Sequence, residues 1–164
     1  MDAKILDEKD LDRFHTRKNP RLKNYDYSSR YYYFVTIGTQ NKHCLFGNPD
    51  KLNLMGKIAS NCLQDIPSHF QGVIIDKYAI MPNHVHAIII LHGNGTVLST
   101  VIGQYKASVT RKSRLLCPDI QVWQASFHDH IIRDQADYER IWLYIEANPA
   151  RWMDDCFYRP QPDL

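Results

Sequence analysis

The sequence lacks paired cysteines, a long apolar run and a strong net charge, and each absence removes a class of protein. Four cysteines are scattered over 164 residues and none forms a Cys-x-x-Cys pair, which argues against a zinc ribbon and suits reduced thiols. The longest apolar run, residues 87–91, is far too short to span a bilayer, and the opening residues show no signal peptide. We therefore expect a cytoplasmic protein without membrane segments.

The formal net charge is only +2, so any binding of nucleic acid must depend on a local basic patch. One candidate is the end of a basic, tyrosine-containing arm in residues 1–30, which includes Arg21 and Lys23. A second is residues 104–114, where no acid interrupts the basic residues Lys106, Arg111, Lys112 and Arg114. Both segments are candidates for contact with phosphates. The alternative is a solvated tail for the arm and a solvated helix face for residues 104–114.

What the chain does contain is the apolar content of one ordinary globular domain, 44% of its residues. The periodicity predicts a strand at 31–37, a helix at 55–66 ended by Pro67, strands at 73–80 and 84–91, a helix at 98–109, an extended segment at 121–131 and a helix from Asp134 to Asn148. This β-α-β-β-α-β order predicts an α+β, ferredoxin-like antiparallel sheet with two helices on one face and an additional C-terminal helix. We expect one domain at 31–152 and a tail at 153–164.

Two histidines stand at the start of the most apolar strand. In a strand, alternate side chains share a face, so His84 and His86 point the same way while Val85 points opposite. Two imidazoles side by side form half of a metal site. The alternative is a pair of histidines at the wet edge of a sheet.

The last helix carries a second pair of polar side chains. Tyr144 and Asn148 are one helical turn apart and lie on one flank of the apolar stripe. Read alone, they are a partly buried tyrosine and an asparagine that ends the helix before Pro149. Tyr105 is a rival for any role of a tyrosine, but it lies within the apolar stripe of its own helix and is predicted to belong to the core.

In combination these motifs resemble a known family. Residues 84–86, His-Val-His, look like the histidine–hydrophobic–histidine signature of the HUH single-strand endonucleases. Residues 144–149, Tyr-Ile-Glu-Ala-Asn-Pro, are similar to the Tyr-Ile-x-x-Asn-Pro motif of the REP-associated tyrosine transposases, relatives of the one-tyrosine insertion-sequence transposases. Further agreeing stretches are 21–28, 34–37, 81–86 and 129–133.

The resemblance implies a role for each of these side chains. His84, His86 and Asn148 would bind a divalent ion, Mg²⁺ or Mn²⁺, and Tyr144 would be the nucleophile. The enzyme would then cut and join single-stranded DNA that forms hairpins, through a 5′-phosphotyrosine. The resemblance leaves open whether the protein is a monomer or a homodimer, and whether Tyr144 meets the histidines of its own chain.

Two more histidines lie on the extended segment before the last helix. His130 is predicted to be structural, orienting a ligand at most. His128 stands where the family often has an aromatic residue, and this departure would add a titratable group near the site without touching the key residues.

Two other functions compete with the transposase hypothesis. A non-catalytic nucleic-acid-binding module would stack bases on exposed aromatic residues of the sheet such as Tyr31 and Tyr33. A hydrolase with a metal held by histidines would cut with metal-bound water and would form no covalent link to DNA.

Overall fold

The structure is a computed structural model that describes residues 31–93, 95–155 and 158. Its elements are β1 (Tyr31–Gly38), η1 (Gln40–Lys42), β2 (Gly47–Asn48), β3 (Lys51–Leu52), α2 (Leu54–Gln64), α3 (Ile66–His69), β4 (Val73–Met81), β5 (His84–Leu91), α4 (Leu98–Ser113), β6 (His128–Ile132), α5 (Gln135–Ala147) and η2 (Pro149–Asp154). The basic arm predicted at 1–30, with Arg21 and Lys23, lies outside the described residues, as does most of the tail at 153–164.

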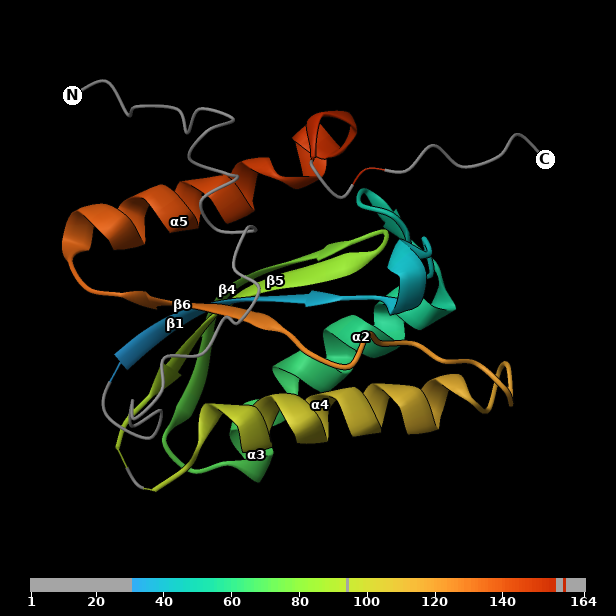
Figure 1. Ribbon diagram of the computed structural model, residues 1–164, viewed down its shortest axis with the longest axis horizontal. Helices are drawn as coiled ribbons and strands as arrows, with labels where there is room; N and C mark the ends of the chain where they lie inside the picture. The colour runs from blue at the N-terminus through green and yellow to red at the C-terminus, as the bar shows by residue number, and fades with distance from the viewer. Residues whose placement is uncertain (1–30, 94, 156–157, 159–164) are drawn as a thin grey trace.

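One antiparallel sheet organises the molecule, with its four strands in the order β4-β5-β1-β6. The helices α2 and α4 cover one face of this sheet, and α5 crosses the other face (Figure 1). The α+β class with an antiparallel sheet is therefore confirmed, and the elements that form the sheet and its cover on that face follow one another as β1, α2, β4, β5, α4 and β6. Among the described residues, no helix is both long and apolar enough to cross a membrane.

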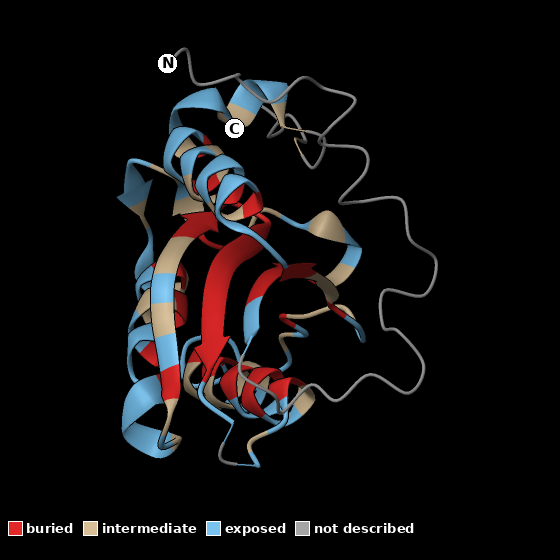
Figure 2. Cartoon of the chain, turned by 90° about the vertical axis from the view of Figure 1, so that its left-hand side faces the viewer, coloured by how far each residue is buried: buried red, intermediate tan, exposed pale blue. Residues whose placement is uncertain are grey.

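The central strands β1 and β5 are buried on both faces because helices cover both sides of the sheet (Figure 2). The larger apolar cluster lies between the sheet and α2 and α4, and the smaller one lies under α5. Tyr105 belongs to the larger cluster, as predicted: it is 2% exposed and its hydroxyl donates to the Ala59 carbonyl oxygen. Burial raises the pKa of Tyr105 well above its ordinary value.

Three local expectations were wrong. Pro67 does not simply end a helix: α2 ends at Gln64 and Pro67 lies in the first turn of α3, where a missing N–H is tolerated. The extended segment at 121–131 is a strand only from His128; before it, Trp123 forms an isolated bridge with Thr39, and the carbonyls of residues 124–126 accept from the Lys106 ammonium. Tyr33 is fully buried on the face under α2 and α4, whereas Tyr31 and Tyr32 are exposed.

Candidate active site and metal centre

The histidine pair lies at the beginning of β5, on the face of the sheet that α5 covers. The Pro82-Asn83 connection delivers His84 as the first residue of the strand, and alternation places His86 beside it. Both side chains are fully buried, and their Nε2 atoms are 3.0 Å apart. The histidines therefore face one another and do not lie at a wet sheet edge.

Hydrogen bonds behind the rings set the direction of each lone pair. The Asn83 amide nitrogen donates to the Lys42 carbonyl, so its Oδ1 accepts from His84 Nδ1 at 2.8 Å. His84 Nε2 then carries a lone pair. His86 Nδ1 lies 2.9 Å from Thr36 Oγ1, and when this nitrogen donates to the hydroxyl, His86 Nε2 also presents a lone pair. Two facing lone pairs attract a cation.

The geometry and the donor set fit a divalent ion. Two neighbouring ligand atoms of an octahedral ion, each about 2.1 Å from it, lie about 3.0 Å apart, which matches the separation of the two Nε2 atoms. Asn148 Oδ1 is buried and has no hydrogen-bond partner among the described residues, as expected of an atom that awaits a ligand. Imidazole nitrogen with amide oxygen suits Mn²⁺ and Mg²⁺.

Asp155 was missed by the sequence analysis. Its Oδ2 lies 3.6 Å from His84 Nε2, and one ligand atom from each of His84, His86 and Asp155 falls within a span of 4.8 Å. The turn η2 returns the chain over the site after Asn148 and places the Trp152 ring 6.0 Å from that of His84. No spacing in the sequence signals this return, because a 3₁₀ turn after a proline has no apolar period to detect.

Tyr144 approaches the histidines from α5. Its hydroxyl lies 3.2 Å from His86 Nε2. The Phe34 ring stacks on His86 at 5.4 Å and meets Tyr144 edge-on at 6.0 Å, so it packs against both side chains. The tyrosine and the histidine pair thus meet within a single chain.

The start of α5 is anchored to the sheet by charged groups. Asp134 caps the helix by accepting from the Asp137 backbone N–H at 2.8 Å, as predicted. The Asp137 carboxylate binds His130 of β6 at 2.7 Å and Arg140 at 2.6 Å. Burial opposes ionisation of Asp137, but these hydrogen bonds outweigh it and lower its pKa. His130 therefore helps to position the helix that carries Tyr144.

The basic residues of α4 lie on the side of the sheet away from α5 (Figure 1). The Lys106 ammonium donates to the carbonyls of Gln124, Ala125 and Ser126, which ties it to the loop before β6. The other three, which lie at or just beyond the end of α4 with their side chains exposed or half-buried, are Arg111, Lys112 and Arg114.

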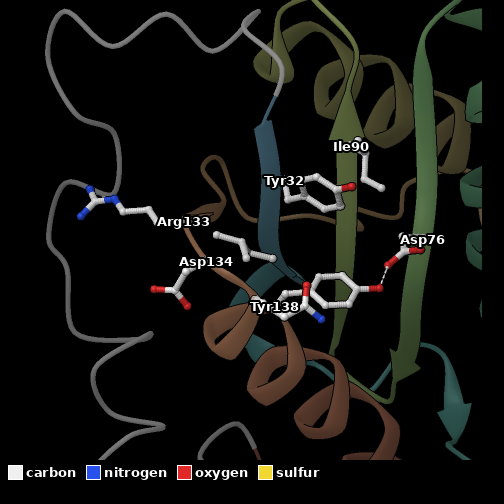
Figure 3. A pocket seen from close by; sticks show the side chains of 8 residues that line it. Tyr32, Asp76, Ile90, Arg133, Asp134 and Tyr138 are labelled. Atoms are coloured by element: carbon white, nitrogen blue, oxygen red, sulfur yellow. Dashed lines mark hydrogen bonds between the residues drawn. The ribbon is translucent and has the colours of Figure 1, made fainter.

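A pocket of about 410 Å³ opens farther along the α5 face of the sheet (Figure 3). Tyr32 and Tyr138 meet edge-on in it, with ring centroids 5.8 Å apart. The Tyr138 hydroxyl donates to Asp76 at 2.6 Å, and this bond raises the pKa of Tyr138 to about 12. The pocket therefore combines aromatic rings with hydrogen-bonding groups.

Comparisons with known proteins identify relatives of this chain. A protein of Haemophilus influenzae without a characterised function is 35% identical over 169 residues, covering 88% of this chain and 94% of that protein. A second protein of that organism carries the name of a REP-associated tyrosine transposase and is 27% identical over 142 residues, covering 79% and 77% of the two chains.

A solved structure has the same fold. It is a REP-associated tyrosine transposase bound to a REP hairpin, superposes with a TM-score of 0.64 at 20% identity, and covers 80% of this chain and 73% of that one. The model of the IS200-like transposase family matches residues 26–148, which include His84, His86 and Tyr144. The chain therefore belongs to the IS200-like transposase family.

Proposed function

We propose that this transposase is a metal-dependent single-strand DNA endonuclease and strand transferase with Tyr144 as its nucleophile. The observation that carries the proposal is the 3.2 Å contact between the Tyr144 hydroxyl and His86 Nε2, beside the facing Nε2 of His84. A tyrosine, with an ordinary pKa of about 10, is a weak nucleophile at neutral pH and needs a neighbouring group that favours its ionised form. A divalent ion, when bound here, supplies that help and neutralises charge on the scissile phosphate.

The ion would be held by His84, His86 and Asn148, with Asp155 as a fourth candidate ligand. The two imidazoles are oriented by Asn83 and Thr36, so these neighbours fix which nitrogen faces the ion. The Asp155 carboxylate adds the negative charge that a neutral His-His-Asn set lacks.

The reaction is a transesterification. Tyr144 Oη attacks phosphorus, an Oη–P bond forms, and the bond from phosphorus to the 3′-oxygen breaks. The phenol proton leaves to water and the 3′-oxygen gains one. The products are a 5′-phosphotyrosine and a free 3′-hydroxyl. Because one phosphoester replaces another, a 3′-hydroxyl can later attack the same linkage and join strands without ATP.

The proposed substrate is single-stranded DNA that folds into a hairpin, as in the REP-bound relative of the same fold. The exposed basic residues of α4, with Arg21 and Lys23 of the arm, would contact phosphates. Tyr32 lies four residues before Thr36 on β1, about 13 Å along the strand. The aromatic pocket at Tyr32 would therefore receive an unpaired base close to the cleaved bond.

The test is denaturing gel electrophoresis after incubation with Mn²⁺ and a labelled single strand that carries a hairpin from repeats flanking the gene. We expect a slowly migrating covalent band with the wild type and none with Tyr144→Phe, a loss of at least about 10³-fold. Tyr105→Phe is the matched control, because it also removes one phenolic hydroxyl, and it should keep the band.

Two results would contradict the proposal. Cleavage by both wild type and Tyr144→Phe without a covalent band would indicate a hydrolase that uses water. Tight binding without cleavage by any variant would indicate a non-catalytic binding module.

A further inference from the structure

A third histidine, His128, stands in the same row of the sheet as His86. Thr36 of β1 is directly opposite His86 of β5 on one side and His128 of β6 on the other. Neighbouring strands are about 4.8 Å apart, so the Cα atoms of His86 and His128 are separated by about 10 Å. The two histidines thus flank Thr36.

His128 faces the same side of the sheet as Tyr144. His130, two residues farther along β6, binds Asp137 of α5, so its side chain points to the α5 face. Alternation gives His128 the same direction, and the register of β6 against β1 runs without a bulge. Thr36 confirms the direction of this row, because its hydroxyl contacts His86 on that face.

The neighbourhood of Thr36 is polar. The Gln124 amide lies over Gly38, the next residue of β1 on this face, where a Cβ would come within 2.5 Å of the amide nitrogen. His128 Nδ1 is buried and has no hydrogen-bond partner among the described residues. Burial lowers the pKa of His128, and the positive charge of Lys42 lowers it further. The partly buried His128 imidazole, with the Lys42 cation near it, thus lies on the opposite side of Thr36 from Tyr144.

In an in-line displacement the leaving oxygen departs on the side of phosphorus opposite the attacking atom. Tyr144 Oη lies over His86 on β5, and His128 lies on the same face two strands away, so for a phosphate bound between these two side chains the leaving oxygen would point across β1 toward β6. We propose that His128 is a further catalytic residue, which exchanges a proton with the 3′-oxygen of the cleaved bond. This inference rests on the function proposed for Tyr144.

The proton balance is complete for both directions. In cleavage, the His128 imidazolium gives its proton to the 3′-oxygen as the bond to phosphorus breaks, the Tyr144 proton leaves to water, and His128 regains a proton from water. In joining, neutral His128 takes the proton of the attacking 3′-hydroxyl, and the released phenolate takes one from water.

The experiment compares two hairpin substrates, one with the normal 3′-oxygen at the cleaved bond and one with sulfur in its place. A thiol has a pKa of about 8.5, so a thiolate leaves without being protonated. We expect His128→Gln to slow formation of the covalent band about 10²-fold on the oxygen substrate and less than about 3-fold on the sulfur substrate. His128→Phe, which keeps a ring but no proton, should show the same selectivity, and exposed His92→Gln should slow neither reaction.

Each other result has a definite reading. Equal losses on both substrates, or no loss on oxygen, would overturn the role of His128 while leaving Tyr144 as the nucleophile. Absence of the covalent band from the wild type with both substrates would overturn the proposed function and this inference together.

Discussion

The two faces of β5 are equally buried and chemically opposite. Val85, Ala87, Ile89 and Leu91 face α2 and α4 within the larger apolar cluster. On the other face, His84 and His86 precede Ile88 and Ile90, and both histidines are completely buried. Burying an apolar side chain stabilises a fold, whereas a buried polar group costs stability unless it has partners. The apolar face therefore contributes stability directly, whereas on the other face hydrogen bonds to Asn83 and Thr36 offset the cost of burying the two histidines.

The comparison predicts separable losses. Tyr144→Phe, described above, should have the largest effect of all, on activity and not on folding. Changes on the apolar face, on the histidine face and at the anchor of α5 should affect stability, in falling order of size.

On the apolar face, Ile89→Ala should lower the free energy of unfolding by about 2–5 kcal/mol, because Ile89 is fully buried and its truncation leaves a cavity. Urea denaturation measures this loss. Ile74→Ala, on the neighbouring strand but 43% exposed, should change it by only about 0.5 kcal/mol. Folded Ile89→Ala protein should still form the Tyr144 adduct. Loss of the adduct without unfolding would show that the faces are not separable.

On the histidine face, Mn²⁺ should raise thermal stability, by about 2.7 kcal/mol at a concentration of 100 times its dissociation constant. His86→Ala should abolish this gain, and exposed His92→Ala should keep it. Scanning calorimetry with and without Mn²⁺ measures the effect. A full gain in His86→Ala would rule out the histidine pair as the binding site.

The same measurement ranks the two candidate oxygen ligands. Asn148→Ala and Asp155→Ala each remove one of them, and the variant with the smaller Mn²⁺ gain identifies the stronger ligand. A gain unchanged in Asn148→Ala but lost in Asp155→Ala would replace the ligand set that the resemblance implied with the one that the structure adds.

What the sequence could predict was local. Strand alternation placed His84 and His86 on one face, and the apolar stripe with Asp134 and Pro149 set the bounds of α5, because both depend on neighbouring residues. The approach of Tyr144 to His86 joins residues 58 positions apart, and only the family resemblance anticipated it. Asp155 reaches His84 through a turn that has no periodic pattern.

Tyr33 shows the limit of alternation used alone. The period of two correctly separates Tyr33 from Tyr32, but it does not say which set of side chains lies under helices. Helices cover both faces of β1, so both sets of side chains are largely apolar or aromatic, and the sequence shows no difference between the two faces. The aromatic residues that reach solvent are Tyr31 and Tyr32, at the end where the cover stops.

The smallest expected effect concerns the anchor that holds α5 over the histidine face. Hydrogen bonds from His130 and Arg140 outweigh the burial of Asp137 and lower its pKa below the ordinary value of 3.8. A carboxyl group whose pKa is lower in the folded state stabilises the fold fully above its unfolded pKa, and this contribution is lost as pH falls through the folded pKa. The free energy of unfolding of the wild type should therefore exceed that of Asp137→Asn near pH 5, and this excess should shrink as the pH falls toward about 2.

Chemical denaturation at a series of pH values measures that difference, with exposed Asp50→Asn as the control. The advantage should be constant above about pH 5, because Asp137 is then ionised in both states. An advantage that persists unchanged at the acid end would contradict the lowered pKa. Because the Asp137 pair joins β6 to the first turn of α5, Asp137→Asn should also slow adduct formation by displacing Tyr144 from His86, an effect that Asp50→Asn lacks.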